Sequence, residues 1–230
     1  MARTQRTDLR ERADALLDAA ATLLIEVGSR ELRIDEVARR AGVGKGTVYL
    51  HWRSREELLL AVGARAAVAM LDEVLAAIRA DPVEAALHRY LRRHFLAAMR
   101  RPLLRSLFAD PAHPGAHPAR AGVLAAKLVA ARAHLAALRE HGLLRPGQDL
   151  ADIDHAAQAI AYGFFAAGPL LPAGPRFTLE HRADQLADVI RRSFEPSTPP
   201  APELFAAAAP QVLAAFAELR TEFHHLAYGP

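Results

Sequence analysis

Apolar residues recur at the spacing of a helical face along nearly the whole chain, and glycine and proline fall mostly at the breaks between these segments. Residues three and four positions apart share one side of an α-helix, whereas the apolar residues of a half-buried strand alternate. Alternation of β-branched residues is nearly absent, so no segment requires a strand. The 230-residue chain is therefore predicted to be all-α.

Breaks in this pattern set the expected helix boundaries. Gly28 is the expected stop of the first helix, Ser54 and Glu57 form a capping box for the fourth, and Pro210 is expected in the first turn of the last. A loop is expected over residues 110–118, because its prolines remove backbone donors. The expected helices cover residues 8–27, 34–40, 45–51, 55–80, 83–99, 102–109, 119–141, 151–167 and 179–194, with a last one after a proline-rich linker.

Composition excludes several classes of site. The chain has no cysteine, so disulfides, thiolate metal sites and cysteine nucleophiles are ruled out. Its 11 histidines lack carboxylates at metal-ligand spacing, and no nucleophile stands beside a base, so neither a metal site nor a catalytic residue is expected. Residues 1–12 are polar, which predicts no secretory signal, and glycine and proline interrupt the longest uncharged run. We therefore expect a cytoplasmic protein without a membrane partner.

The segment 41–52, A-G-V-G-K-G-T-V-Y-L-H-W, admits two interpretations from different functional classes. As a nucleotide-binding phosphate loop it would have to read G-x-x-x-x-G-K-[ST] after a strand. Arg39 stands where the first glycine would be, Gly46 follows Lys45 in place of serine or threonine, and the preceding segment has a helical pattern. The alternating glycines also fail the dinucleotide pattern G-x-G-x-x-G. Nucleotide binding therefore fits poorly.

A tight turn between two helices fits the same residues. Ala41 is small enough for a close helix crossing, Gly42 can take the left-handed conformation that ends a helix, and Val43 can enter the core. Gly44 is an acceptable N-cap for the next helix. This order is typical of a helix-turn-helix, whose second helix presents its N-terminal residues to the DNA major groove.

Charge supports the turn interpretation, although the formal net charge is only +3. Every charged residue between Val37 and Arg55 is positive, which concentrates basic side chains around the turn. These residues are Arg39, Arg40, Lys45, Arg53 and Arg55. A solvated basic face without function would look the same by charge alone.

The segment from Arg10 to Val62, and above all I-D-E-V-A-R-R-A-G-V-G-K-G-T-V-Y-L-H-W-R-S-R-E-E-L-L, resembles the DNA-binding domain of the TetR family of bacterial transcriptional regulators. The resemblance covers about a quarter of the chain. It implies a DNA-binding domain over residues 8–54 and a helical ligand-binding and dimerisation domain over 55–194. We expect a proline-rich linker over 195–202 and an additional C-terminal helix over 203–230, which can pack on the bundle, extend the dimer or cover the pocket.

The resemblance also implies individual roles in the DNA site. Lys45 would reach phosphate or guanine, Thr47 phosphate or a thymine methyl, and Tyr49 a phosphate through its hydroxyl. The residues expected to contact DNA are Arg33, Gly44, Lys45, Gly46, Thr47, Tyr49, His51 and Arg55. Two positions depart from the family pattern: Gly44 replaces a side-chain cap, and Trp52 replaces phenylalanine. We expect Trp52 to fill the core of the small domain.

Dimerisation is expected because two helix-turn-helix units must lie about 34 to 36 Å apart to read two half-sites on successive turns of DNA. The helices over 151–167 and 179–194 would form a four-helix bundle with their symmetry mates. The same residues could instead form an ordinary intramolecular core. The expected interface residues are Ala156, Ala159, Ile160, Gly163, Phe164, Leu186, Val189 and Ile190.

A pocket for an unknown small-molecule effector is expected between the helices over 83–99, 102–109 and 119–141. Its lining would be apolar with a few polar groups, although a core role fits each polar residue as well. The expected lining residues are His94, Phe95, Met99, Leu104, Phe108, Leu128, His134 and Tyr162.

The resemblance predicts a ligand-responsive regulator, a repressor released from double-stranded operator DNA by a small apolar molecule, with no cofactor and no enzymatic activity. Release requires that the ligand favour the conformer that cannot bind DNA, in which the fourth helix has shifted. Two alternatives remain open. One is a nucleotide-binding enzyme that uses G-V-G-K-G-T, and the other is a protein-interaction module with a vestigial DNA domain.

Overall fold

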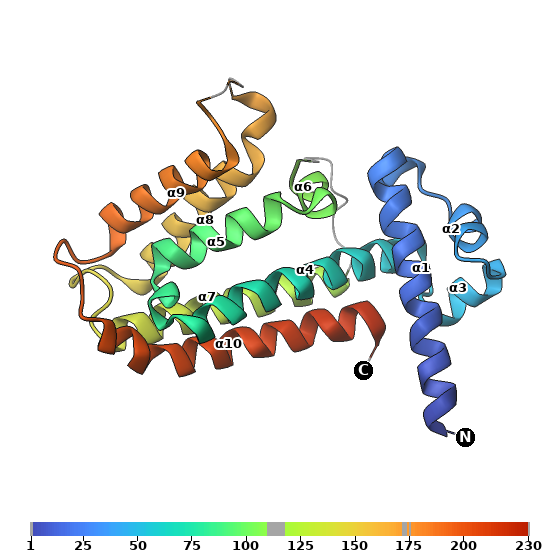
Figure 1. The fold of residues 1–230 in the computed structure, drawn as a ribbon, viewed down its shortest axis with the longest axis horizontal. Helices are drawn as coiled ribbons and strands as arrows, with labels where there is room; N and C mark the ends of the chain where they lie inside the picture. Colours follow the sequence, from blue (N-terminus) through green and yellow to red (C-terminus); the bar gives the residue numbers. More distant parts are fainter. Residues whose placement is uncertain (1, 110–117, 172–173, 175, 230) are drawn as a thin grey trace.

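The computed structural model describes residues 2–109, 118–171, 174 and 176–229, and these residues form helices and connecting segments without a β-strand (Figure 1). The predicted all-α class is thereby confirmed. The loop expected over 110–117 lies outside the described residues. Within the described ranges, no helix combines the length and apolar character that crossing a membrane requires.

The N-terminal end consists of four helices: α1 (Ala2–Glu31), α2 (Ile34–Arg40), α3 (Lys45–His51) and α4 (Arg55–Ala80). The second, third and fourth begin and end where the sequence predicts. The first begins earlier than expected, at Ala2, and its backbone is interrupted at Gly28 (φ +78°, ψ 172°), where the sequence predicts the stop; a further short helical segment follows to Glu31. A residue that has a Cβ rarely adopts this backbone conformation.

The start of α4 follows the predicted capping pattern. Ser54 Oγ accepts a hydrogen bond from the N–H of Glu57 (3.1 Å), which satisfies a donor of the first turn. Glu57 reaches back to the N–H of Arg53 (2.7 Å), one residue before the position that a standard capping box uses. These two bonds fix the direction in which the chain leaves α3 and enters α4.

The larger part of the chain follows α4. Its elements are η1 (Pro82–Ala85), α5 (Leu87–Met99), α6 (Pro102–Ala109), α7 (Pro118–Glu140), α8 (Leu150–Ala166), η2 (Gly168–Leu170), α9 (Leu179–Phe194) and α10 (Pro202–Tyr228). The prediction for Pro210 is wrong: Pro202 occupies the first turn of α10, and Pro210 lies inside the helix on its exposed side. Both prolines fit a helix start locally, and the earlier one begins the helix.

Two hydrophobic cores organise these helices. The first is formed by α1, α2, α3 and the start of α4, and Leu103 of α6 joins it. The second is formed by the rest of α4 with the helices that follow it. Ala66 of α4 and Tyr228 of α10 pack against both cores, so they lie at the junction of the two parts. Figure 1 shows α1 to α3 grouped at one end of the molecule and α10 running towards them.

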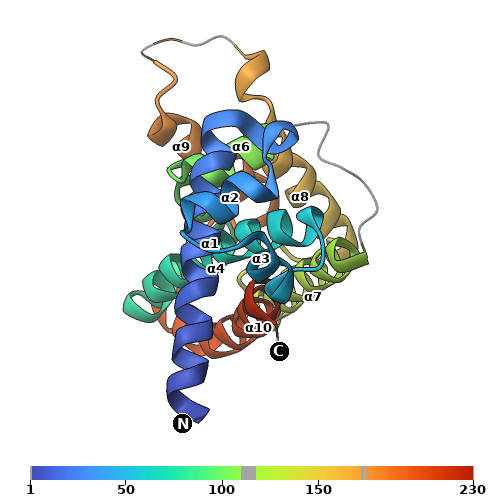
Figure 2. The ribbon, with the colours of Figure 1, turned by 90° about the vertical axis from the view of Figure 1, so that its right-hand side faces the viewer.

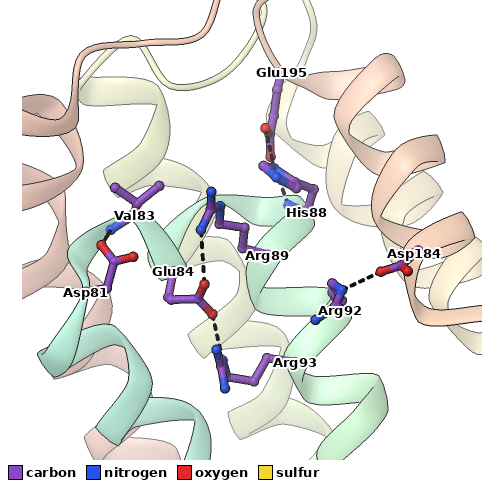
Figure 3. A network of polar contacts seen from close by, with 9 residues as sticks. All are labelled: Asp81, Val83, Glu84, His88, Arg89, Arg92, Arg93, Asp184 and Glu195. Atoms are coloured by element: carbon purple, nitrogen blue, oxygen red, sulfur yellow. Dashed lines mark hydrogen bonds and ion pairs between the residues drawn. The ribbon is translucent and has the colours of Figure 1, made fainter. Parts of the chain in front are cut away.

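Polar contacts tie α5 to its neighbours (Figure 3). Glu195, at the C-terminal end of α9, accepts a hydrogen bond from the backbone N–H of His88 (2.8 Å) and pairs with its ring Nδ1 (2.7 Å). The start of α5 has no side-chain cap of its own, so Glu195 supplies one. Arg92 bonds to Asp184 of α9 (2.7 Å), which makes a second polar link between the two helices.

Candidate nucleic-acid interface

The turn between α2 and α3 is closed by two backbone hydrogen bonds. The N–H of Val43 donates to the carbonyl of Ala38 (3.0 Å), and the N–H of Gly42 donates to that of Arg39 (3.2 Å). Gly42 has φ +69°, so the pair forms a Schellman motif with glycine in the left-handed position. The Thr47 N–H then bonds to the Gly44 carbonyl (2.9 Å) and starts α3. The segment is therefore a helix-turn-helix.

One face of α3 points to solvent at the end of the molecule (Figure 2). Val48 is fully buried on the opposite face, which fixes the rotation of the helix. Tyr49 is 45% exposed and Leu50 is 82% exposed. We call the exposed set the reading face; its members are Lys45, Gly46, Tyr49, Leu50 and Arg53.

Leu50 and Arg53 were not predicted as DNA contacts. Leu50 could have been found from helical periodicity, because a residue two positions after inward-pointing Val48 lies on the opposite side of the helix. Leu50 presents methyl groups of the kind that pack on a thymine methyl in the major groove. Arg53 adds a positive charge just beyond the end of α3. Its basic side chain next to the helix-turn-helix is the feature from which a DNA contact could have been predicted.

Two of the predicted contacts have other positions in the structure. The His51 ring is half-buried beside Trp52 (ring centroids 5.3 Å apart), and its Nε2 is buried without a hydrogen-bond partner among the described residues. Burial and the charge of Arg12 lower the pKa of His51. The prediction that His51 ends the exposed reading face is therefore wrong, because its ring turns inward.

Arg55 also has a structural position. Its Nε donates to the carbonyl oxygen of Leu32 (2.9 Å), and its Nη2 donates to that of Ser29. The half-buried guanidinium thus holds the connection between α1 and α2. Arg33 lies nearby, exposed, with its Nε 3.6 Å from Asp35.

The basic residues around the turn differ in how they are paired. Glu36 bonds to Arg39 (2.9 Å through Nε) and to Arg40 (3.2 Å), and these arginines lower the pKa of Glu36 to about 2. Arg40 also pairs with Glu26 (2.7 Å). In the part of the chain that the structure describes, Lys45 has no ion pair. The positive charge available to a nucleic acid is therefore concentrated on the reading face.

Trp52 ends α3 and is buried in the N-terminal core, as expected. Its backbone N–H donates to the carbonyl of Val48 (2.9 Å), and its indole N–H donates to the carbonyl oxygen of Ala227 in α10 (3.3 Å). The second bond could not be predicted, because 175 residues separate the partners.

Residues of the expected effector pocket fall into three groups. Tyr162 is 64% exposed, so its assignment as a pocket residue is wrong within this chain. Leu128 is half-buried, and Phe108 falls outside the residues whose side chains are described. The remaining predicted residues face the interior between the helices: His94, Phe95, Met99, Leu104 and His134.

An aromatic and histidine cluster occupies this interior. Tyr90 stacks on Phe216 of α10 (centroids 4.8 Å apart) and shares a hydrogen bond between its hydroxyl and Nδ1 of His94 (3.2 Å). His134 Nε2 donates to the carbonyl of Ala85 (2.7 Å). Burial lowers the pKa of His94, helped by the charge of Lys127, and that of His134, in each case to about 4. Both rings are therefore neutral near pH 7.

A polar pocket of about 290 Å³ lies apart from this cluster and was not predicted. Glu84, at its wall, accepts hydrogen bonds from Arg89 (3.2 Å) and Arg93 (2.6 Å), as Figure 3 shows. Its lining residues are Glu84, His88, Arg89 and Arg92. Because its charges are already paired, the pocket differs from the apolar one that the sequence predicts. The described residues contain no group of three or more acidic or histidine side chains placed to hold a metal ion.

The residues expected at a dimer interface differ in how far they are buried within one chain. Leu186 and Ile190 have no exposed surface, so they belong to the core of one chain and their assignment to the interface is wrong. Ala156, Ile160 and Phe164 are partly buried and pack against that core. Ala159, Gly163 and Val189 are exposed. A helical stripe in the sequence does not separate an inner apolar face from an outer one when both are apolar.

Comparison with known proteins agrees with this geometry. Residues 16–62 match the family described as "Bacterial regulatory proteins, tetR family". The chain is 36% identical over 62 residues to "Uncharacterized HTH-type transcriptional regulator TtgW" of Pseudomonas putida, across 27% of this chain and 46% of that protein. The match thus spans less than half the length of this relative.

Solved structures share the fold over most of the chain. SmeT, the repressor of the Stenotrophomonas maltophilia multidrug efflux pump SmeDEF, superposes with a TM-score of 0.63 at 20% identity, covering 83% of this chain and 93% of that one. A SmeT–triclosan complex matches with the same TM-score of 0.63 and 20% identity, over 83% of this chain and 98% of that one. The helix-turn-helix segment over residues 16–62 is thus that of the TetR family of bacterial regulatory proteins, and most of the chain shares the fold of SmeT.

Proposed function

We propose that the protein is a transcriptional repressor that binds operator DNA as a homodimer and is released by a small apolar molecule. The observation that carries this proposal is the reading face on the second helix of a helix-turn-helix, which combines a lysine, a tyrosine and an exposed leucine. In this motif the N-terminal part of the second helix enters the major groove. A repressor acts where the chromosome lies, so we place the protein in the bacterial cytoplasm.

The reading face suits a duplex chemically. Lys45 and Arg53 can neutralise phosphates, and the Tyr49 hydroxyl can donate to a phosphate oxygen. Gly46 lies between them and has no side chain, so the DNA backbone can approach α3 closely there. The space that a Cβ would fill holds no protein atom within 4 Å and is open to DNA. Leu50 can pack on thymine methyls.

A homodimer is supported by apolar surface on the side of α8 and α9. Tyr162 and Val189 are exposed large apolar side chains of these helices, and exposed Gly163 lets a second backbone approach closely. Further exposed apolar residues follow in η2 and before α9: Leu170, Leu171 and Phe177. An apolar surface of this kind is typical of an interface between subunits.

An effector site is supported by the aromatic and histidine cluster between α5, α7 and α8. Neutral histidines beside phenylalanines offer an apolar surface with a few hydrogen-bonding atoms, which is the usual composition of a small-molecule pocket. SmeT, which shares the fold, is known in complex with triclosan. An effector that fits better when the helices around the cluster have moved would weaken DNA binding by shifting the population.

The test is selection of duplexes from a random pool by the purified protein. The proposal predicts enrichment of a sequence with two related half-sites whose centres lie about 10 base pairs, or a multiple, apart. Enrichment should fail for Lys45→Ala combined with Tyr49→Phe and persist for Arg79→Gln, which removes an exposed positive charge at the far end of α4. No enriched sequence from the unmodified protein would contradict the proposal.

A further inference from the structure

The last helix joins the two parts of the molecule. From Phe205 to Ala227 its buried side is part of the larger core, where it packs along α4 and α7. Figure 1 shows it running beside α4 towards α1. The helix begins far from the helix-turn-helix, and its last turn reaches Trp52 at the end of α3, so α10 runs from the aromatic and histidine cluster to the end of α3.

The last turn of α10 is bonded to Trp52, the residue that ends α3, which is the recognition helix of the helix-turn-helix. The final carbonyl groups of a helix lack partners inside the helix. That of Ala227 accepts the indole N–H of Trp52 (3.3 Å), and the backbone N–H of Trp52 closes α3 on Val48 (2.9 Å). A displacement of this turn therefore acts directly on the C-terminal end of α3.

A second set of bonds joins the same turn to α1. The Tyr228 hydroxyl donates to Asp14 (2.5 Å), and the Arg10 guanidinium lies over the Tyr228 ring, 3.2 Å from its centroid. Arg10 also lies 3.2 Å from Nε2 of His224. These contacts come from two different turns of α1, so they resist both sliding and rotation of α10 against that helix.

The other contacts of α10 fix it to the helices of the larger core, which contain the expected effector site. Arg220 forms two hydrogen bonds with Asp72 of α4 (2.5 and 3.1 Å). Phe216 stacks on Tyr90 and meets the ring of His134 (centroids 5.5 Å apart), so the middle of α10 forms one wall of the aromatic and histidine cluster. One helix thus contacts the expected effector site at its centre and the recognition helix at its end.

We infer that the last turn of α10 positions the recognition helix, with Trp52 and Tyr228 as its positioning residues. In the part of the chain that the structure describes, α4 and the packing of α6 also join the N-terminal helices to the larger core. The bonds from the last turn of α10 are a second connection, beside α4, and they hold α3 at one angle to the larger helical part of the chain. In a dimer this angle sets the separation of the two α3 helices. This inference rests on the proposed function for its consequence on DNA.

The first experiment measures discrimination between half-site spacings. The probe is the duplex selected by the unmodified protein, with and without one inserted base pair between the half-sites, which rotates one half-site by about 34°. We expect the insertion to weaken binding about 10-fold or more for the unmodified protein and for Glu222→Gln, an exposed change on the same helix. We expect about 3-fold or less for Trp52→Phe with Tyr228→Phe, because a loosely held α3 adapts to either spacing.

A second experiment needs no DNA. Because the chain has no cysteine, spin labels can be placed at Glu31→Cys and Arg79→Cys, both exposed, and labelled protein can be diluted with unlabelled protein. The distance distribution between the labels reports the angle of the N-terminal domain to α4. We expect a broader distribution in Trp52→Phe with Tyr228→Phe, and in Tyr228→Phe alone should the double variant lose its helical circular dichroism.

The two experiments separate the two claims. Distributions of equal width in the variant and the unmodified protein would overturn the positioning role, whether or not the protein binds DNA. An equal loss of affinity on insertion would overturn it as well. Failure of the unmodified protein to select any duplex would instead contradict the proposed function, and the spin-label result would still decide the role of α10.

Discussion

The indole N–H of Trp52 bonds to the carbonyl oxygen of Ala227, which links the end of the recognition helix to the last turn of the chain. Phenylalanine, the residue that the family resemblance implies at this position, has no donor for such a bond. The tryptophan, which departs from the pattern that the resemblance implies, thus makes a contact with the last helix that phenylalanine could not make.

Replacement of Trp52 by phenylalanine should lower the free energy of unfolding by about 1 to 3 kcal/mol, because the Ala227 carbonyl loses its donor in a buried site. Urea denaturation followed by far-ultraviolet circular dichroism measures the change. Tyr49→Phe is the matched control, since Tyr49 is exposed and its loss of a hydroxyl should alter stability by less than about 0.5 kcal/mol. Equal effects of the two substitutions would contradict the assigned bond.

Two glycines of the helix-turn-helix should respond oppositely to alanine. Gly42→Ala forces a Cβ into the left-handed conformation at φ +69° and should cost about 1 kcal/mol of stability. Gly46→Ala should raise stability slightly, because Gly46 is helical and its Cβ would meet no protein atom within 4 Å. It should nevertheless weaken binding to the selected duplex, because the methyl group separates α3 from DNA. Full affinity in Gly46→Ala would contradict the close approach.

Protonation of His134 should destabilise the protein at acidic pH. Its pKa is lowered to about 4 by burial, against about 6.5 in an unfolded chain, so the unfolded state binds more protons between these values. Stability should therefore fall as the pH drops through 6.5, by about 2 to 3 kcal/mol at pH 4.5 from this group. His134→Gln keeps a donor for Ala85 and should remove that part of the slope, which urea denaturation over a pH series measures. An unchanged slope would contradict the burial of a neutral ring.

Arg55 should matter for folding before it matters for DNA. Arg55→Gln removes the bonds to the carbonyls of Ser29 and Leu32 and should cost about 1 to 2 kcal/mol of stability. Lys45→Ala, at an exposed position, should change stability by less than about 0.5 kcal/mol. Thermal or urea denaturation of the two variants compares them. If Arg55→Gln unfolds like the unmodified protein, the expected phosphate contact becomes the better account of this residue.

Local signals were sufficient for much of the fold. The bounds of α2 and α3 follow from Gly42 and Gly44, and the start of α4 follows from Ser54 and Glu57, because caps and turns depend on neighbours in sequence. Pro210 shows the limit of the same rule. Its sequence context fits a helix start as well as that of Pro202, and the local sequence does not show which of the two begins α10.

The site was less predictable, because burial depends on contacts between distant segments. His51 and Arg55 have the residue types of DNA contacts, yet one turns towards Trp52 and the other binds the end of α1. Leu186 and Ile190 form the same apolar pattern as exposed Val189, and the sequence does not show which residues another helix covers. The hydrogen bond of Tyr228 to Asp14 in α1 spans 214 residues and has no local signal.

The most direct test of the reading face is the salt dependence of binding to the selected duplex, measured for the unmodified protein and for Lys45→Ala with Tyr49→Phe. Each phosphate contact that is lost should reduce the slope of log affinity against log salt by about 0.9. The account predicts a shallower slope and at least about 10-fold weaker binding for the double variant, with Arg79→Gln unchanged. The same slope and affinity in the double variant as in the unmodified protein would contradict binding through this face of α3.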